Sequence, residues 1–269
     1  MSPRPQGGKP RPPGGKPTRR ELGGDQIEGR QAVRELLVAG RRRVFELLVA
    51  SGGDARGPLR DLVDLAGKVR VPVKEVSAGK LAAAARTESP QGVIARCAPL
   101  EEVELESLTK RRKGVAPLLL AVDGVTDPGN LGALLRAAEC SGITGVVLPR
   151  HRSVHITPTV AKAAAGAIEH LSMAVVPGLP SALERLKEAG VWVVGLDGGG
   201  DGRIDRLPLA REPLVLVFGA EGRGLSPLVR KRCDVVAAIP LRGRLASLNV
   251  AAAGAIACYE VARQRASAD

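Results

Sequence analysis

The sequence predicts a two-domain α/β protein, and three observations support this fold class. The chain has 269 residues and is 44% hydrophobic, which is enough for two ordinary domains with real cores. From residue 116 onward, buried strands alternate strictly with helices, as in a mostly parallel sheet covered on both faces. A shorter alternating region precedes residue 100, and a strongly charged segment separates the two regions.

Two basic segments lie outside the predicted domains. Residues 1–24 hold six Pro, six Gly and six Lys or Arg, so burial cannot offset the entropy of ordering them, and we expect a disordered basic tail. Residues 101–114 change from acidic to basic, which is typical of an interdomain linker. The linker ends in the run Lys110, Arg111, Arg112 and Lys113, which we predict to bind RNA phosphates.

The first predicted domain is a small α/β unit at residues 25–100. Apolar residues recur at helical spacing in its first two helices, Pro58 suits a first helical turn, and Ser77 suits an N-cap. The predicted helices are residues 31–39, 58–68 and 77–85, and the predicted strands are residues 44–50, 71–76 and 92–97.

The second predicted domain, residues 115–269, is a larger parallel sheet with helices on both faces. Its predicted strands are residues 118–123, 145–148, 172–176, 191–196, 214–218 and 235–240. Its predicted helices are residues 131–140, 157–168, 181–189, 227–231 and 248–263.

Charge and composition indicate the partner and the compartment. A net charge of +12 favours nucleic acid over the alternative of a mere solubility feature, while an aromatic content of 1% disfavours stacking platforms. The four cysteines form no C-x-x-C pair, so reduced thiols are expected. The start lacks an apolar signal core, and the longest apolar run, residues 245–258, is too short for a bilayer. We therefore expect a cytoplasmic protein without a membrane partner.

Several common active-site motifs are missing from the sequence. It contains no G-x-G-x-x-G, P-loop, G-x-S-x-G or H-E-x-x-H pattern. His151 and His155 are spaced i, i+4, but Arg150 and Arg152 beside them disfavour a divalent metal, so we expect no metal site. This basic loop instead predicts phosphate binding by Arg150 and Arg152, with a solvated surface loop as the alternative.

Three segments carry the candidate chemistry, and the first is DPGNLGALLRAA at residues 127–138. Pro128 and Gly129 force a turn, and Asn130 then lies at a helix start, where it can cap amide groups. Gly132 would leave space for a ligand one turn from Arg136, whose guanidinium would project beside that space. The alternative for Arg136 is a surface ion pair with Glu139.

The second and third segments follow two later strands. GAEGRG at residues 219–224 is a glycine-rich turn of a common kind, but its Glu221 could orient Arg136 or a ligand group. SLN at residues 247–249 begins a helix, with Ser247 as a possible N-cap and Asn249 in need of polar partners if buried. The small residues after it predict close packing, either in the core or between subunits.

In this order, the three segments resemble the motifs of the SpoU family of RNA 2′-O-ribose methyltransferases, within the knotted SPOUT superfamily. GRQAV at residues 29–33 and PQGV at residues 90–93 resemble the two ends of that family's L30e-like substrate-binding domain. The layout is most similar to bacterial enzymes that methylate a guanosine of 23S ribosomal RNA. Gly129, Ser89-Pro90 and Pro177-Gly178 depart from the family pattern, the first at a place where substrate contacts would change.

The resemblance implies a trefoil knot in the C-terminal domain, a homodimer, and 23S ribosomal RNA or its precursor as substrate. The implied catalytic residues are Asn130, Arg136, Glu221, Ser247 and Asn249, with Arg136 at the ribose 2′-hydroxyl as base or electrostatic stabiliser. S-adenosyl-L-methionine would bind through groups around Gly195, Gly219, Ala220, Glu221, Gly222, Ile239, Leu241, Ser247, Leu248 and Asn249. Methylation of transfer RNA or of an antibiotic site on ribosomal RNA, and a noncatalytic RNA-binding role in ribosome assembly, are the alternatives.

Overall fold

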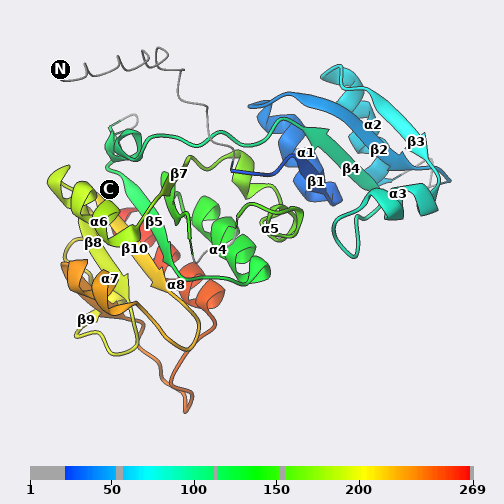
Figure 1. Ribbon diagram of the computed structural model, residues 1–269. Coiled ribbons are helices and arrows are strands. Elements are labelled where there is room, and N and C mark those ends of the chain that lie inside the picture. The colour runs from blue at the N-terminus through cyan, green and yellow to red at the C-terminus, as the bar shows by residue number, and fades with distance from the viewer. Residues whose placement is uncertain (1–21, 53–56, 112–113, 152–154, 267–269) are drawn as a thin grey trace, which may run out of the picture.

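A computed structural model describes residues 22–52, 57–111, 114–151 and 155–266. Within these residues the chain forms two sheets, each with its own helices, as Figure 1 shows. Most of the predicted tail lies outside the described residues, as do Arg112, Lys113 and Arg152 of the predicted RNA-binding set. Residues 22–24 are described and packed, because the Leu22 amide donates to the Leu100 carbonyl and the Gly24 amide to the Ile156 carbonyl.

The N-terminal sheet has the strand order β1-β4-β2-β3 in the described chain. Helices α1 and α2 cover one face, and Leu81 of α3 packs on the other. The segments at residues 29–33 and 90–93 meet, since the Arg30 amide donates to Gln91 Oε1 over 3.0 Å. The elements are β1 (Gln26–Glu28), α1 (Arg30–Ala39), β2 (Val44–Ala50), α2 (Pro58–Lys68), β3 (Val73–Val76), α3 (Ala78–Ala84) and β4 (Val93–Cys97).

The C-terminal sheet is parallel throughout its described strands, with the order β7-β6-β5-β10-β8-β11-β9. Its strands are β5 (Leu118–Asp123), β6 (Gly145–Pro149), β7 (Met173–Val176), β8 (Trp192–Leu196), β9 (Gly202–Arg203), β10 (Leu214–Gly219) and β11 (Val235–Ala238). The short edge strand β9 was not predicted, because two residues carry no periodicity. Successive residues of β5 face opposite sides, so this sheet needs two apolar helix layers.

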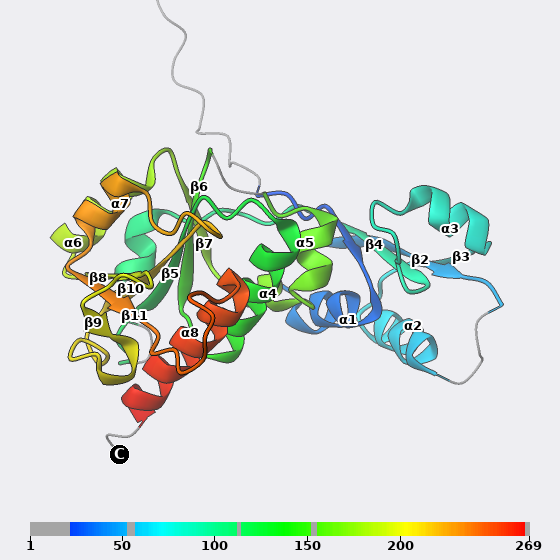
Figure 2. The ribbon, with the colours of Figure 1, turned by 90° about the horizontal axis from the view of Figure 1, so that it is seen from below.

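Those two helix layers are visible in Figure 2. Helices α4 (Pro128–Cys140), α5 (Pro158–Ala163) and α8 (Val250–Ala266) pack on one face, and α6 (Leu179–Glu188) and α7 (Pro227–Arg232) pack on the other. The prediction of a mainly parallel α/β fold is therefore confirmed. The trefoil knot stays a prediction.

Two segments differ from the predicted elements, and both differences arise from packing. The single helix expected at residues 157–168 ends at Ala163, and a 3-10 turn, η2 (Ala167–Glu169), follows after Ala165 and Gly166 adopt positive φ. The break lets this chain lie directly against Glu35 of α1. The expected linker also contains a turn, η1 (Leu105–Thr109), whose Leu105 and Leu108 are buried in the second helix layer.

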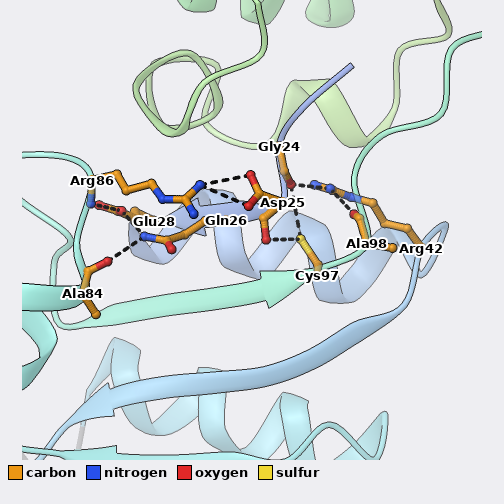
Figure 3. A network of polar contacts seen from close by, with 9 residues as sticks. All are labelled: Gly24, Asp25, Gln26, Glu28, Arg42, Ala84, Arg86, Cys97 and Ala98. Carbon is orange, nitrogen blue, oxygen red and sulfur yellow. Dashed lines mark hydrogen bonds and ion pairs between the residues drawn. The ribbon is translucent and has the colours of Figure 1, made fainter. Parts of the chain in front are cut away.

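A buried ion pair joins the two parts of the chain. Arg42 Nη2 lies 2.5 Å from Glu169 Oε1, and the two side chains are only 7% and 0% exposed. Arg42 Nη1 also donates to the carbonyls of Gly24 and Ala98, as Figure 3 shows. The same guanidinium therefore binds the N-terminal sheet and the turn η2 that follows α5.

The cysteines are unpaired thiols in the described structure. Burial raises the pKa of Cys97 and of Cys233 to about 11, and that of Cys258 to about 12, because a thiolate loses its hydration there. These three thiols are protonated at neutral pH, and Cys140 is the exposed one.

None of the helices in the described ranges is both long and apolar enough to cross a bilayer.

Candidate active site

A cavity of about 580 Å³ opens at the carboxyl ends of three neighbouring strands, β8, β10 and β11. Ligands of open α/β sheets bind at this edge, where loops and helix starts converge. The wall is formed by the loops after these strands and by the first turns of α8. The predicted cofactor residues on the wall are Gly219, Ala220, Glu221, Gly222, Ile239, Leu241, Ser247 and Leu248.

The glycine-rich turn after β10 folds back on its own strand. The Ala220 amide donates to the Gly224 carbonyl over 3.1 Å, and the Gly224 amide donates back over 2.9 Å. A Cβ at Gly219 would overlap the Gly224 backbone, so only glycine allows the turn to pack this closely against the end of β10. The turn thereby presents Glu221 at its tip, exposed at the cavity.

A chain of three polar side chains joins the three sequence segments. Asn130 Nδ2 donates to Glu221 Oε2 over 3.1 Å, and Asn249 Nδ2 donates to Asn130 Oδ1 over 2.8 Å. These residues are 91 and 119 positions apart in sequence, so only the fold brings them together. Because each of these side chains fixes the next, the three hydrogen-bonded residues together hold the start of α4, the turn after β10 and the start of α8 in one arrangement.

The helix caps differ from those expected. Asp127, not Asn130, caps α4, because its Oδ1 accepts from the Asn130 amide over 2.6 Å. Asn249, not Ser247, caps α8, because its Oδ1 accepts from the Ala251 amide over 2.8 Å. The side chain of Asn130 is thus free for its bonds to Glu221 and Asn249, and the Ser247 residue faces the cavity.

Arg136 lies two turns beyond Asn130 on α4 and does not line the cavity. Gly132 leaves no space for a ligand beside it, which corrects our expectation, because Ala163 and Val160 of α5 occupy that space. Neither Glu139 nor Glu221 pairs with Arg136. Within the described residues, the exposed Arg136 guanidinium makes no ion pair or hydrogen bond to the protein, so it is available to a substrate.

Two predicted cofactor residues lie off the cavity wall. Gly195 is buried inside β8, where a Cβ would lie 2.6 Å from Leu225 and 2.7 Å from the Cys233 sulfur, so its role there is packing. Asn249 lies beside the wall, between Leu248 and Val250, and is linked through Asn130 to Glu221 on the wall.

The loop after β8 is a part of the cavity wall that was not predicted from the sequence. Burial raises the pKa of Asp197, but the Gly199 amide and the Arg230 guanidinium outweigh burial and hold this pKa below its ordinary value. Asp197 therefore places a fixed negative charge on the wall, 3.1 Å from Arg230 Nη1. The signal was present as DGGG at residues 197–200, a second glycine-rich turn at a strand end.

The predicted RNA-binding residues do not form a single patch. Arg150 follows β6 at the carboxyl edge of the sheet, the edge that bears the cavity. Lys110 and Arg111 follow η1, whose Leu108 packs at Gly145 where β6 begins, so they lie at the opposite edge. These residues are exposed or half-exposed, and their contact with RNA stays a prediction.

Taken together, the parallel sheet, its glycine-rich strand ends and the polar chain beside the cavity define an α/β enzyme with a small-molecule site. Residues 117–259 match the SpoU rRNA Methylase family, and residues 26–103 match the model described as RNA 2′-O ribose methyltransferase substrate binding. The chain belongs to the SpoU rRNA methylase family.

Individual relatives support this assignment along nearly the whole chain. The 23S rRNA (guanosine-2′-O-)-methyltransferase RlmB of Pseudomonas aeruginosa is 41% identical over 245 residues, covering 90% of this chain and 97% of RlmB. RlmB of Pseudomonas putida is 38% identical over 244 residues, with 90% and 97% covered. In fold, the chain resembles the SpoU methyltransferase AviRb from Streptomyces viridochromogenes in complex with AdoMet, with a TM-score of 0.74, 24% identity and 90% of each chain covered.

Proposed function

We propose that this protein transfers a methyl group from S-adenosyl-L-methionine to a ribose 2′-oxygen of RNA, at a guanosine of 23S ribosomal RNA. The observation that carries the proposal is the hydrogen-bonded series Glu221–Asn130–Asn249, which joins the three family motifs beside the cavity. A module that only binds RNA does not need these polar side chains in one fixed arrangement. The similarity to RlmB, over 90% of this chain, favours the 23S substrate.

The cavity fits S-adenosyl-L-methionine in size and chemistry. Its volume of about 580 Å³ lies within the range of small-molecule sites. Phe218, Val250 and Ala253 offer an apolar surface for a purine, and the backbone of the turns at residues 197–199 and 219–224 offers hydrogen-bonding groups. Asp197 and Glu221 add carboxylates for hydroxyl or amino groups. When bound, the cofactor supplies an electrophilic methyl group on its sulfonium.

The protein's task in the reaction is to orient the 2′-hydroxyl and stabilise the negative charge that develops on its oxygen. Arg136 suits the second role, because its guanidinium has no partner among the residues that the structure describes and carries a permanent positive charge. Asn130 and Asn249 hold the site rigid, and Ser247 offers a hydroxyl on the cavity wall. Alignment of the attacking oxygen by such groups alone can lower the barrier by several kcal/mol.

The defining experiment supplies the purified protein, S-adenosyl-L-methionine and an unmodified 23S rRNA transcript. We expect one 2′-O-methylguanosine per transcript, located by mass mapping, with the same rate in the presence of a metal chelator. A modified transfer RNA instead would move the assignment to the first alternative, and modification elsewhere in the 23S rRNA would favour an antibiotic site. Cofactor-independent RNA binding without methyl transfer would support the noncatalytic role.

We further propose that the protein is a homodimer that pairs through α8. One face of this helix is buried, while Ala252, Ala255, Ile256 and Tyr259 form an exposed stripe at helical spacing. Ile256 is 43% exposed and Tyr259 65% exposed, and monomers rarely leave such apolar stripes in water. A second copy of the chain would cover the stripe.

Replacing Ala255 with arginine is expected to give folded, inactive monomers. The side chain points outward, so the fold tolerates the arginine, but a dimer would have to bury an unpaired cation. Light scattering would measure the mass, and circular dichroism would check the fold. Ala83→Arg on the exposed face of α3 is the matched control and should leave the dimer intact. A dimeric Ala255→Arg variant would rule out this interface.

We assign RNA substrate binding to residues 25–100, methyl transfer to residues 115–269, and a linking role to residues 101–114. The two family matches, at residues 26–103 and 117–259, support these bounds. We also infer that residues 1–24, Lys110–Lys113, Arg150 and Arg152 attract RNA phosphates, since they are rich in positive charge. We also propose a cytoplasmic location, which the proposed ribosomal RNA substrate supports.

A further inference from the structure

A second cavity, of about 670 Å³, lies in the N-terminal domain, at the C-terminal ends of α1 and α2 and the start of β2. We propose that it binds an unpaired nucleotide of the RNA substrate, whose base stacks on Arg43 and Phe45 while Arg43 and Arg70 bind the flanking phosphates. The proposal rests on the proposed function, because it concerns the same RNA outside the methylated nucleotide.

The first observation is the charge of this cavity. Arg42, Arg43 and Arg70 line it, and the described lining contains no acidic residue. Arg42 forms an ion pair with Glu169. Within the described residues, the guanidinium groups of Arg43 and Arg70 have no carboxylate partner. Two cations without a carboxylate partner in the described part of the chain, on a concave surface, complement a phosphate backbone.

The second observation is an aromatic side chain in an unusual position. The chain has only two phenylalanines; Phe218 is buried, whereas Phe45 is 49% exposed and faces this cavity. Phe45 is the extra residue of a β-bulge, because Val44 pairs with Cys97 and Glu46 already pairs with the preceding residue, Arg96. Bulges redirect side chains and are common beside functional sites.

The Arg43 guanidinium lies over the Phe45 ring, 5.5 Å from its centre. A cation on an aromatic face forms a flat surface on which a base can stack, and unpaired bases of RNA are bound by such aromatic and guanidinium planes. Although the low aromatic content argues against an extended platform, this arrangement needs one ring only. Duplex RNA does not offer a free base face, so the chemistry selects an unpaired segment.

The third observation is the backbone of Arg70, which has φ +59°. This residue follows the C-terminal end of α2, two positions after Lys68, in the left-handed conformation. The Arg70 amide donates to the Gly67 carbonyl, and the Val71 amide donates to the Ala66 carbonyl. Glycine is the favoured residue at such a position, and any side chain there is conformationally costly. An arginine at a position that favours glycine indicates that its guanidinium has a function, here in binding RNA.

The test measures methylation of an unmodified 23S rRNA transcript by the full-length variants Arg43→Ala, Phe45→Ala and Arg70→Gly. We expect KM for RNA to rise roughly tenfold in Phe45→Ala, as for loss of one stacked base, with kcat and S-adenosyl-L-methionine affinity unchanged. Arg70→Gly should also raise KM and flatten the dependence of RNA affinity on salt, while its melting temperature stays equal or rises.

Lys80→Ala, which removes an exposed cation of α3 in the same domain, is the matched control. An equal rise of KM in Lys80→Ala would overturn the site in favour of general charge attraction. Unchanged KM in all three cavity variants would overturn the proposal and assign the cavity to a protein ligand or to none. If the wild-type protein methylates no RNA, the proposed function fails first, and the two failures are therefore distinguishable.

Discussion

Arg136→Ala is expected to lower kcat for methyl transfer by at least about a hundredfold, while S-adenosyl-L-methionine binds with nearly wild-type affinity. The size follows from removing one group that stabilises the charge developing in the transition state. The unchanged cofactor affinity follows from geometry, because Arg136 does not line the cavity. Single-turnover assays would give the rate, and calorimetry would give the cofactor affinity.

The controls for Arg136 separate charge, geometry and fold. Arg136→Lys keeps a cation but loses the planar fork, so partial activity would indicate electrostatic stabilisation. Arg206→Ala removes another exposed arginine of the same domain and should leave kcat unchanged. Substantial turnover by Arg136→Ala would remove this residue from the reaction. The melting temperature should stay constant, because the side chain has no partner among the described residues whose loss could destabilise the fold.

Periodicity predicted the fold where local pattern and packing agree. The bounds expected for β2 and α2 are those observed, because buried strands and amphipathic helices leave a regular record in sequence. Periodicity did not predict the structure where contacts between residues distant in sequence determine it. The break at Ala165 serves contact with α1, and the burial of Leu105 and Leu108 was hidden by the charged residues around them.

The candidate site shows the same division. The three segments were recognisable from residue types and order, and eight of the predicted cofactor residues lie on the cavity wall. The roles of individual side chains were not predictable, because Asn130 could cap its own helix or reach across the site, and only the position of Asp127 decides. Asp197 was missed because a lone DGGG turn resembles any loop.

Glu169→Ala is expected to lower the free energy of unfolding by about 3–5 kcal/mol, the cost of leaving one member of a buried ion pair without its partner. Arg42 would keep its bonds to the carbonyls of Gly24 and Ala98 but lose its only counter-charge among the described residues. Urea unfolding would measure the change. The exposed pair Glu184–Arg232 provides the control, because Glu184→Ala should cost no more than about 1 kcal/mol.

The same variant tests whether this ion pair also fixes the orientation of the two domains. Calorimetry of Glu169→Ala should resolve two melting transitions, one for each sheet, because a buried contact that couples them is lost. The double variant Arg42→Met/Glu169→Leu removes both charges and should regain much of the lost stability. If the single variant unfolds in one transition at the wild-type temperature, the pair neither stabilises the chain nor couples its domains. If it splits the transition, RNA affinity should fall while cofactor affinity stays the same, since the cavity at the carboxyl ends of β8, β10 and β11 is lined by no residue of the N-terminal domain.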